Sequence, residues 1–179
     1  MQELEVRPGR VTFKWAWKMA LVMILIAIAL FYVNVNQNSF LNYVVYIPFV
    51  LGLMMAIKEH KEKDLEGYIS FSRAFTTGFR YASVISLVMG LFMYIYLKLI
   101  NPQVVEQSLI ETEKLMLNKG ESQEAIKSAI TKARSWGVFM LAVNASISYT
   151  LLGAVFSLIG AAIFKNARPV YIEIERDEL

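Results

Sequence analysis

The amino-acid sequence predicts an all-α, polytopic membrane protein with four transmembrane helices. The first observation is composition: 56% of the residues are hydrophobic and only 18% are charged, whereas an ordinary globular chain carries about 25% charged residues. The second observation is the run from Met19 to Ile57, which contains no charged residue. As one helix this run would be roughly 58 Å long, about twice the thickness of a bilayer core. It must therefore cross the membrane, turn and cross back.

The remaining uncharged runs complete the set of spans. The polar segment at 34–39, NVNQNS, is the expected turn within the long run, because Asn and Ser side chains bond to nearby backbone and interrupt helices. Two further uncharged runs reach or approach the roughly 18 to 20 residues that a span requires. We expect spans at about 15–33, 40–57, 81–97 and 136–164, within a single membrane domain comprising residues 1–179.

The positions of Lys and Arg predict the orientation, because short cytoplasmic loops carry an excess of these residues. Basic residues precede the first span, follow the second and follow the fourth, whereas the turn at 34–39 has none; they are Arg7, Arg10, Lys14, Lys58, Lys61, Lys63, Arg73, Lys165 and Arg168. Both termini, including a tail at 165–179, are therefore predicted to be cytoplasmic. The segment 98–135 is predicted to lie outside, and five glutamates accompany its six basic residues.

The segment ISFSRAFTTGFRY, residues 69–81, predicts a cytoplasmic amphipathic helix before the third span, with Ser70 placed to cap its first turn. At 100° per residue, three phenylalanines share one face and two arginines occupy the opposite one. Such a helix lies at the headgroup level, with its rings toward the acyl chains and its guanidinium groups toward lipid phosphates. Recognition of a specific anionic ligand is the alternative. The residues assigned to the membrane interface, with Lys18 of the first span included, are Phe71, Phe75, Phe79, Arg73, Arg80 and Lys18.

The segment at about 101–135 predicts an extracytoplasmic helical hairpin before the fourth span. Asn101 is placed to cap a first helix that ends near Gly120, and Ser122 is placed to open a second one. Each of these helices has one apolar face. We expect these faces to cover each other and the outer ends of the spans, and a partner-docking surface is the alternative.

The fourth span combines polar and small residues, namely Asn144, Ser148, Tyr149, Gly153 and Ser157. Small residues three and four positions apart let helix backbones approach closely, and polar side chains bond between helices. The pattern therefore favours a central packing helix. A path for a polar solute, lined by Asn144, Ser148 and Tyr149, is the alternative.

The sequence contains no pattern that indicates catalysis, a cofactor or a metal site. It has no cysteine, no Gly-rich phosphate loop, no nucleophile elbow and no helix with paired histidines. The one histidine, His60, lies in a run of mixed charge that we expect to be solvated, and a metal would need further ligands from elsewhere. The net charge of +3 is too small to indicate nucleic-acid binding.

Four short motifs resemble one family of bacterial membrane proteins. They are G-x-I-S-F-x-x-A-F-x-x-G-F at 67–79, Y-x-Y-x-K-x-I-N-P at 94–102, G-E-S-Q-E at 120–124 and L-I-G-A-A-I-F-K at 158–165. Together they resemble domain-of-unknown-function family 4199 and cover most of the chain. The resemblance implies four spans in a bacterial inner membrane. It implies no activity and no catalytic residues.

The expected function rests mainly on the absence of patterns that indicate catalysis, a cofactor or a metal site. We expect a non-catalytic accessory or scaffold subunit, which holds a partner by the hairpin or by the small-residue face of the fourth span. The alternative is a small-solute transporter or channel that acts as a homo-oligomer. The lipid bilayer is the one partner that composition indicates directly.

Overall fold

Residues 9–33, 35 and 39–166 are described by a computed structural model of the chain. In this part helices are joined by turns and short irregular segments, and the one β-type pairing is an isolated bridge between Ile69 and Asn166. In chain order the elements are α1 (Gly9–Tyr32), η1 (Phe40–Val45), α2 (Tyr46–Glu59), η2 (His60–Asp64), α3 (Phe71–Ile95), η3 (Tyr96–Ile100), α4 (Gln103–Asn118) and α5 (Gln123–Phe164). Four helical stretches are long and apolar enough to cross a membrane: Gly9–Tyr32, Phe40–Asp64, Phe71–Ile100 and Gln123–Phe164. They confirm the predicted all-α class with four spans.

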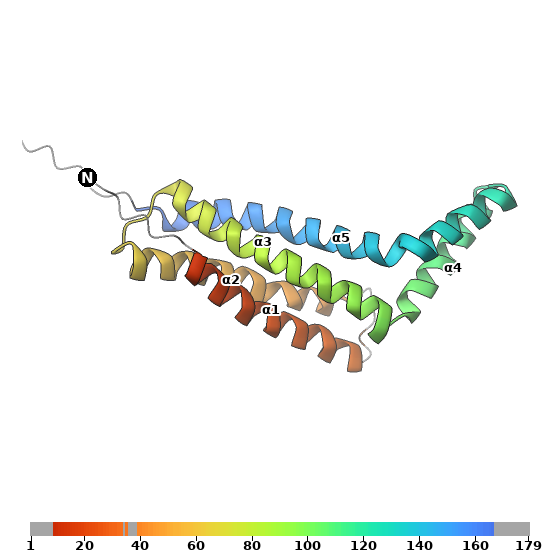
Figure 1. Ribbon diagram of the computed structural model, residues 1–179, viewed down its shortest axis with the longest axis horizontal. Coiled ribbons are helices and arrows are strands. Elements are labelled where there is room, and N and C mark those ends of the chain that lie inside the picture. The colour runs from red at the N-terminus through yellow and green to blue at the C-terminus, as the bar shows by residue number, and fades with distance from the viewer. Residues whose placement is uncertain (1–8, 34, 36–38, 167–179) are drawn as a thin grey trace, which may run out of the picture.

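The four long helices lie side by side, and α3 contacts the other three (Figure 1). α4 and the first part of α5 run beside each other at the end of the molecule away from the start of α1 (Figure 1). We call this pair, residues 101–135, the arm. The predicted turn at 34–39 lies mostly outside the described residues, as does most of the predicted tail at 165–179. Ser39 caps η1 by accepting a hydrogen bond from the Leu41 amide at 3.3 Å.

The amphipathic segment before the third span does not form a helix of its own. Ser70 caps it as predicted, since its hydroxyl accepts a hydrogen bond from the Arg73 amide at 3.4 Å. From Phe71 the helix then continues without a break to Ile95. No proline interrupts this stretch, and Gly78 packs against the side chain of Ser157, so a neighbouring helix supports the backbone there. The phenylalanines and arginines therefore occupy the first turns of α3.

The second helix of the predicted hairpin is likewise continuous with the fourth span. Ser122 caps it, accepting from the Ala125 amide at 3.3 Å, and α5 then runs for 42 residues to Phe164. At 1.5 Å per residue this helix is about 63 Å long, roughly twice the thickness of a bilayer core. A bilayer that encloses the apolar half of α5 therefore leaves its first turns outside, rigidly joined to the span.

A tight turn joins α4 to α5. Gly120 has a φ of 75°, in the left-handed region that glycine adopts without strain. The Gly120 amide donates to the Leu117 carbonyl at 3.0 Å, and the Glu121 amide donates to the Met116 carbonyl at 3.2 Å. These two bonds form a Schellman motif, which ends α4 and satisfies its last carbonyls. The predicted stop near Gly120 is confirmed.

Polar contacts hold the opposite end of the bundle together. The Glu59 carboxylate, at the end of α2, accepts bonds from Lys14 at 2.6 Å, from the Trp15 indole at 2.6 Å and from Lys63 at 3.1 Å. Ile69 and Asn166 exchange two backbone hydrogen bonds of 3.0 and 2.9 Å, which join the segment before α3 to the residues after α5. These contacts tie α1 to α2 and α3 to α5 outside the apolar part of the bundle.

Candidate functional site

A cavity of about 910 Å³ occupies the end of the bundle next to the arm. It is bordered by the end of α1, the start of η1 and α2, and the ends of α3 and η3. The first turns of α4 and the middle of α5 complete its wall. Its apolar wall comes chiefly from Leu30, Phe31, Met89, Phe92, Met93 and Leu97. The volume falls within the roughly 300 to 1,000 Å³ that is typical of small-molecule sites.

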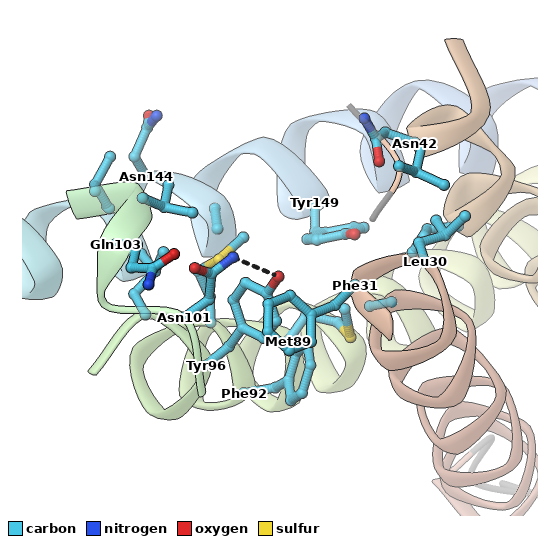
Figure 2. A pocket seen from close by; sticks show the side chains of 18 of the residues that line it. Leu30, Phe31, Asn42, Met89, Phe92, Tyr96, Asn101, Gln103, Asn144 and Tyr149 are labelled. Atoms are coloured by element: carbon cyan, nitrogen blue, oxygen red, sulfur yellow. Dashed lines mark hydrogen bonds between the residues drawn. The ribbon is translucent and has the colours of Figure 1, made fainter. Parts of the chain in front are cut away.

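The polar lining consists of five amides, three tyrosines and one carboxylate. The amides belong to Asn42, Asn101, Gln103, Gln107 and Asn144, the hydroxyls to Tyr46, Tyr96 and Tyr149, and the carboxylate to Glu111. Figure 2 shows Tyr149, Phe31, Phe92 and Tyr96, which come from α5, α1, α3 and η3, around the same space. Ligand pockets usually have a mostly apolar wall with a few convergent polar groups, and this cavity is more polar than that, because nine of its 21 lining residues are polar.

Aromatic rings close the cavity toward the middle of the bundle. Tyr149, which is buried, lies 5.4 Å from Tyr46 and 5.6 Å from Phe49, measured between ring centroids. Phe49 in turn lies 6.0 Å from Tyr81, whose hydroxyl donates to the Phe49 carbonyl at 3.1 Å. Phe49 and Tyr81 are fully buried, so the packed core begins directly below the cavity.

Asn101 contributes to the cavity and does not cap α4. Its side-chain amide donates to the Tyr96 hydroxyl at 3.3 Å, as the dashed line in Figure 2 shows. The N-cap position of α4 is held by Pro102, which provides no side-chain bond. The prediction of an Asn101 cap was therefore wrong, because the Tyr96 hydroxyl five residues earlier offers the amide another partner.

The five residues singled out in the fourth span separate into three groups. Asn144 and Tyr149 line the cavity. Gly153 and Ser157 are buried and lie in the contact between α5 and α3. Ser148 is exposed and lines neither. The candidate path residues are thus not one continuous row, because α5 turns by about 100° per residue and Ser148 points away from its neighbour Tyr149.

The contact between α3 and α5 is built from small residues on both helices. Ser146 donates hydrogen bonds to the Ser86 carbonyl at 3.0 Å and to the Ala142 carbonyl at 3.2 Å. A side chain at Gly90 would collide with the Ser146 hydroxyl. Further along, Gly153 faces Ala82, and Gly78 faces Ser157 so closely that a Cβ on it would lie 2.6 Å from the Ser157 hydroxyl oxygen.

Sequence reasoning identified the small residues of α5 and overlooked their partners on α3. Those partners recur every four residues as Gly78, Ala82, Ser86 and Gly90. This spacing is itself a signal for close helix packing, and it is visible in the sequence. The Ser157 hydroxyl, fully buried in this contact, has no hydrogen-bond partner among the described residues.

The six residues assigned to the membrane interface lie toward the end of the bundle opposite the cavity. Phe75 and Phe79 stack with their centroids 5.7 Å apart, and Phe71 is exposed. Arg80 is exposed and Arg73 half-buried. The Lys18 ammonium lies 5.6 Å from the centroid of the Trp15 ring. Their role at a lipid interface stays a prediction.

His60 is buried and not solvated, contrary to the expectation from its charged neighbours. It is 1% exposed, and its Nδ1 lies 2.8 Å from a carboxylate oxygen of Asp64. The register of α2 is the reason, because His60 lies three residues after the buried Ile57 and four after the buried Ala56, on the same face of the helix. Within the described part of the chain, no group of three or more His, Asp or Glu residues could hold a metal ion.

Comparison with known proteins supports the resemblance that the motifs of the sequence indicated. Neither a curated protein nor a solved structure matches the chain. A family model does match, over residues 14–166, and it is described as a protein of unknown function, DUF4199. Because the match covers most of the 179 residues, the chain belongs to the DUF4199 family.

Proposed function

We propose that this protein is a non-catalytic accessory or scaffold subunit of an assembly in the bacterial inner membrane, and that it holds its partner by the arm. The observation that carries the proposal is the continuity of α5, which extends the fourth span into the arm without a joint. A helix that is rigid across this boundary transmits position from the membrane to a bound protein. A flexible loop of the same length would not.

The interior of the arm supports the same role. Leu109 of α4 and Ile126 of α5 are buried, and Arg134 pairs with Glu106 at 2.9 Å across the two helices. The arm is therefore a defined structure before any partner binds, so that little ordering entropy opposes docking.

The outer face of α4 supplies the surface for the partner. Ile110 and Leu117 are seven residues apart and so lie on the same side of the helix, where their side chains are 50% and 47% exposed. Apolar residues on a helix that extends beyond the bundle lack the lipid environment that accounts for exposed leucines on the spans. They are suited to contact another protein.

The distribution of Lys and Arg supports an orientation with both termini in the cytoplasm and the arm on the outer side. The loop between α2 and α3 carries Lys61 and Lys63, whereas the turn between α1 and η1 has no charged residue. In this orientation the partner binds outside the cytoplasm.

The experiment is gentle extraction of the tagged protein at native expression level, followed by mass spectrometry of what remains bound in fixed ratio. We expect a stoichiometric partner that is lost from an Ile110→Ser, Leu117→Ser double variant. The control is Leu115→Ser, a leucine on another side of α4 that is more exposed than either. Purification without any stoichiometric partner, or equal loss from both variants, would contradict the proposal.

A second candidate function is a small-solute transporter or channel assembled from copies of this chain. It is favoured by the cavity, because Asn144 and Tyr149 both line it. The ring cluster below Tyr149 means that a path must run between chains or open by rearrangement. Flux into reconstituted vesicles that falls with Asn144→Leu, while assembly is unchanged, would establish this function in place of the first.

A further inference from the structure

The charges around the cavity indicate which ligands it accepts. Among the described residues that line it, none is Lys, Arg or His, although the chain has 18 Lys and Arg residues. The one formal charge is the carboxylate of Glu111. Lys98, next to the lining residue Leu97, donates to the Tyr94 hydroxyl at 3.1 Å and lies over the Tyr94 ring, and neither residue lines the cavity. An anion would find no countercharge here.

The aromatic lining adds a second, independent feature. Five rings border the cavity, from Phe31, Tyr46, Phe92, Tyr96 and Tyr149. Phe31 of α1 and Tyr96 of η3 meet edge to face, with centroids 5.9 Å apart and ring planes at 86°, and Phe92 lies 5.7 Å from Tyr96. Phe31, Phe92 and Tyr96 therefore form one aromatic cluster in the lining of the cavity.

Aromatic faces attract cations, because the ring quadrupole is negative above and below the plane. Ammonium groups, quaternary ones in particular, are recognised by such clusters of rings. The carboxylate of Glu111, which lines the cavity and is exposed, adds a negative charge that also favours a cation. We infer that the cavity binds a ligand bearing an ammonium group, whose remaining atoms pack against the apolar wall. This inference goes beyond the accessory role and does not depend on the arm holding a partner.

The ammonium group has two sources, a free small molecule or the headgroup of an aminophospholipid. The cavity lies at the end of the bundle where α1 ends and α2 begins, at the level of one membrane surface if the four helices span the bilayer. Both sources are therefore within reach.

The experiment uses the full chain in nanodiscs made of phosphatidylglycerol alone, whose headgroup has no ammonium. The probes are choline and dimethylbutanol, the neutral analogue in which carbon replaces the ammonium nitrogen, and binding is measured by saturation-transfer NMR. We expect choline to bind roughly tenfold more tightly than the neutral analogue. Equal binding of the two probes would overturn the inference, because it would show that shape and not charge is recognised.

Two variants test the residues. Phe31→Leu retains an apolar side chain but removes the ring, and we expect it to weaken choline binding roughly three- to tenfold. Glu111→Gln removes the charge, and we expect a loss of about two- to fivefold. The matched controls are Phe139→Leu and Glu121→Gln, both exposed and neither lining the cavity. Losses as large in the controls would contradict the assignment.

A second experiment distinguishes the two sources of the ammonium group. Nanodiscs doped with phosphatidylethanolamine are compared with the undoped ones, and lipid retained by the protein is identified by native mass spectrometry. Retention of phosphatidylethanolamine by the unmodified protein but not by Phe31→Leu, together with weaker choline binding, would identify a lipid headgroup. Choline binding unaffected by the lipid would identify a soluble amine. If neither choline nor phosphatidylethanolamine binds, the inference is wrong.

Discussion

Ser146 of α5 donates a hydrogen bond of 3.0 Å to the backbone carbonyl of Ser86 on α3, at the level where Gly90 leaves room for its hydroxyl. In a bilayer, water cannot replace a lost interhelical bond, and lipid offers no hydrophobic drive to bring helices together. Close backbone approach and bonds of this kind are therefore what hold α3 against α5. The same contact continues through Gly153 and Ser157, so its geometry can be tested at several points.

Gly153→Ala is expected to destabilise the bundle by roughly 1 to 3 kcal/mol, as overpacking does. The new methyl group would collide with the Cβ of Ala82, which cannot rotate away. The free energy of unfolding in mixed micelles measures the effect. Restoring space with Ala82→Gly should recover much of the loss, whereas Gly137→Ala, where a Cβ meets nothing within 4 Å, should leave stability unchanged or raise it.

Glu59→Gln is expected to lower the free energy of unfolding by about 1 to 2 kcal/mol, because hydrogen bonds to a charged group contribute more than neutral ones. Glu59 receives bonds from Lys14, Trp15 and Lys63, and its side chain is 13% exposed. Glu62→Gln is the control, since its contact with Lys58 is long, at 3.9 Å, and exposed on both sides. Equal effects of the two substitutions on the free energy of unfolding would show that the contacts of Glu59 do not stabilise the bundle.

Tyr149→Ala is expected to cost about 3 kcal/mol or more of stability, as for other buried rings truncated to alanine. Its neighbour on the cavity wall, Asn144, is exposed, so Asn144→Leu should change the free energy of unfolding by less than about 0.5 kcal/mol. Both variants are compared by thermal unfolding in detergent. A large destabilisation by Asn144→Leu would mean that the amide supports packing and is not simply part of the cavity wall.

Reporter fusions should place the arm and the C-terminus on opposite sides of the membrane. The reporter is inserted at Gly120, in the exposed turn of the arm, and in a second protein it is attached after Leu179. The excess of Lys and Arg near the N-terminus and between α2 and α3 predicts an external arm and a cytoplasmic C-terminus. Activity of both fusions on the same side would rule out this topology.

The number of spans follows from the sequence alone. The uncharged run from Met19 to Ile57 is too long for one crossing, and this argument needs only the rise of a helix and the thickness of a bilayer. Caps are equally local, so Ser70, Ser122 and Gly120 were correctly placed from residue type and position. Each of these features depends on neighbours within a few residues along the chain.

Other features depend on contacts between distant segments. Whether the helix breaks before Tyr81 or before Trp136 is decided by packing and not by a local signal, and both helices are continuous. His60 is buried because it lies on the face of α2 that packs into the bundle, three residues after the buried Ile57.

The cavity depends most on tertiary structure. Its wall combines residues from Ala27 near the end of α1 to Tyr149 in α5, and no short stretch of the sequence contains a recognisable part of it. The amides and rings are scattered along the sequence, and they form a site only because helices of particular length and register bring them to one end of the bundle. The thickness of the bilayer determines how many spans the uncharged runs of the sequence form. The close approach of the helix backbones then decides which side chains meet.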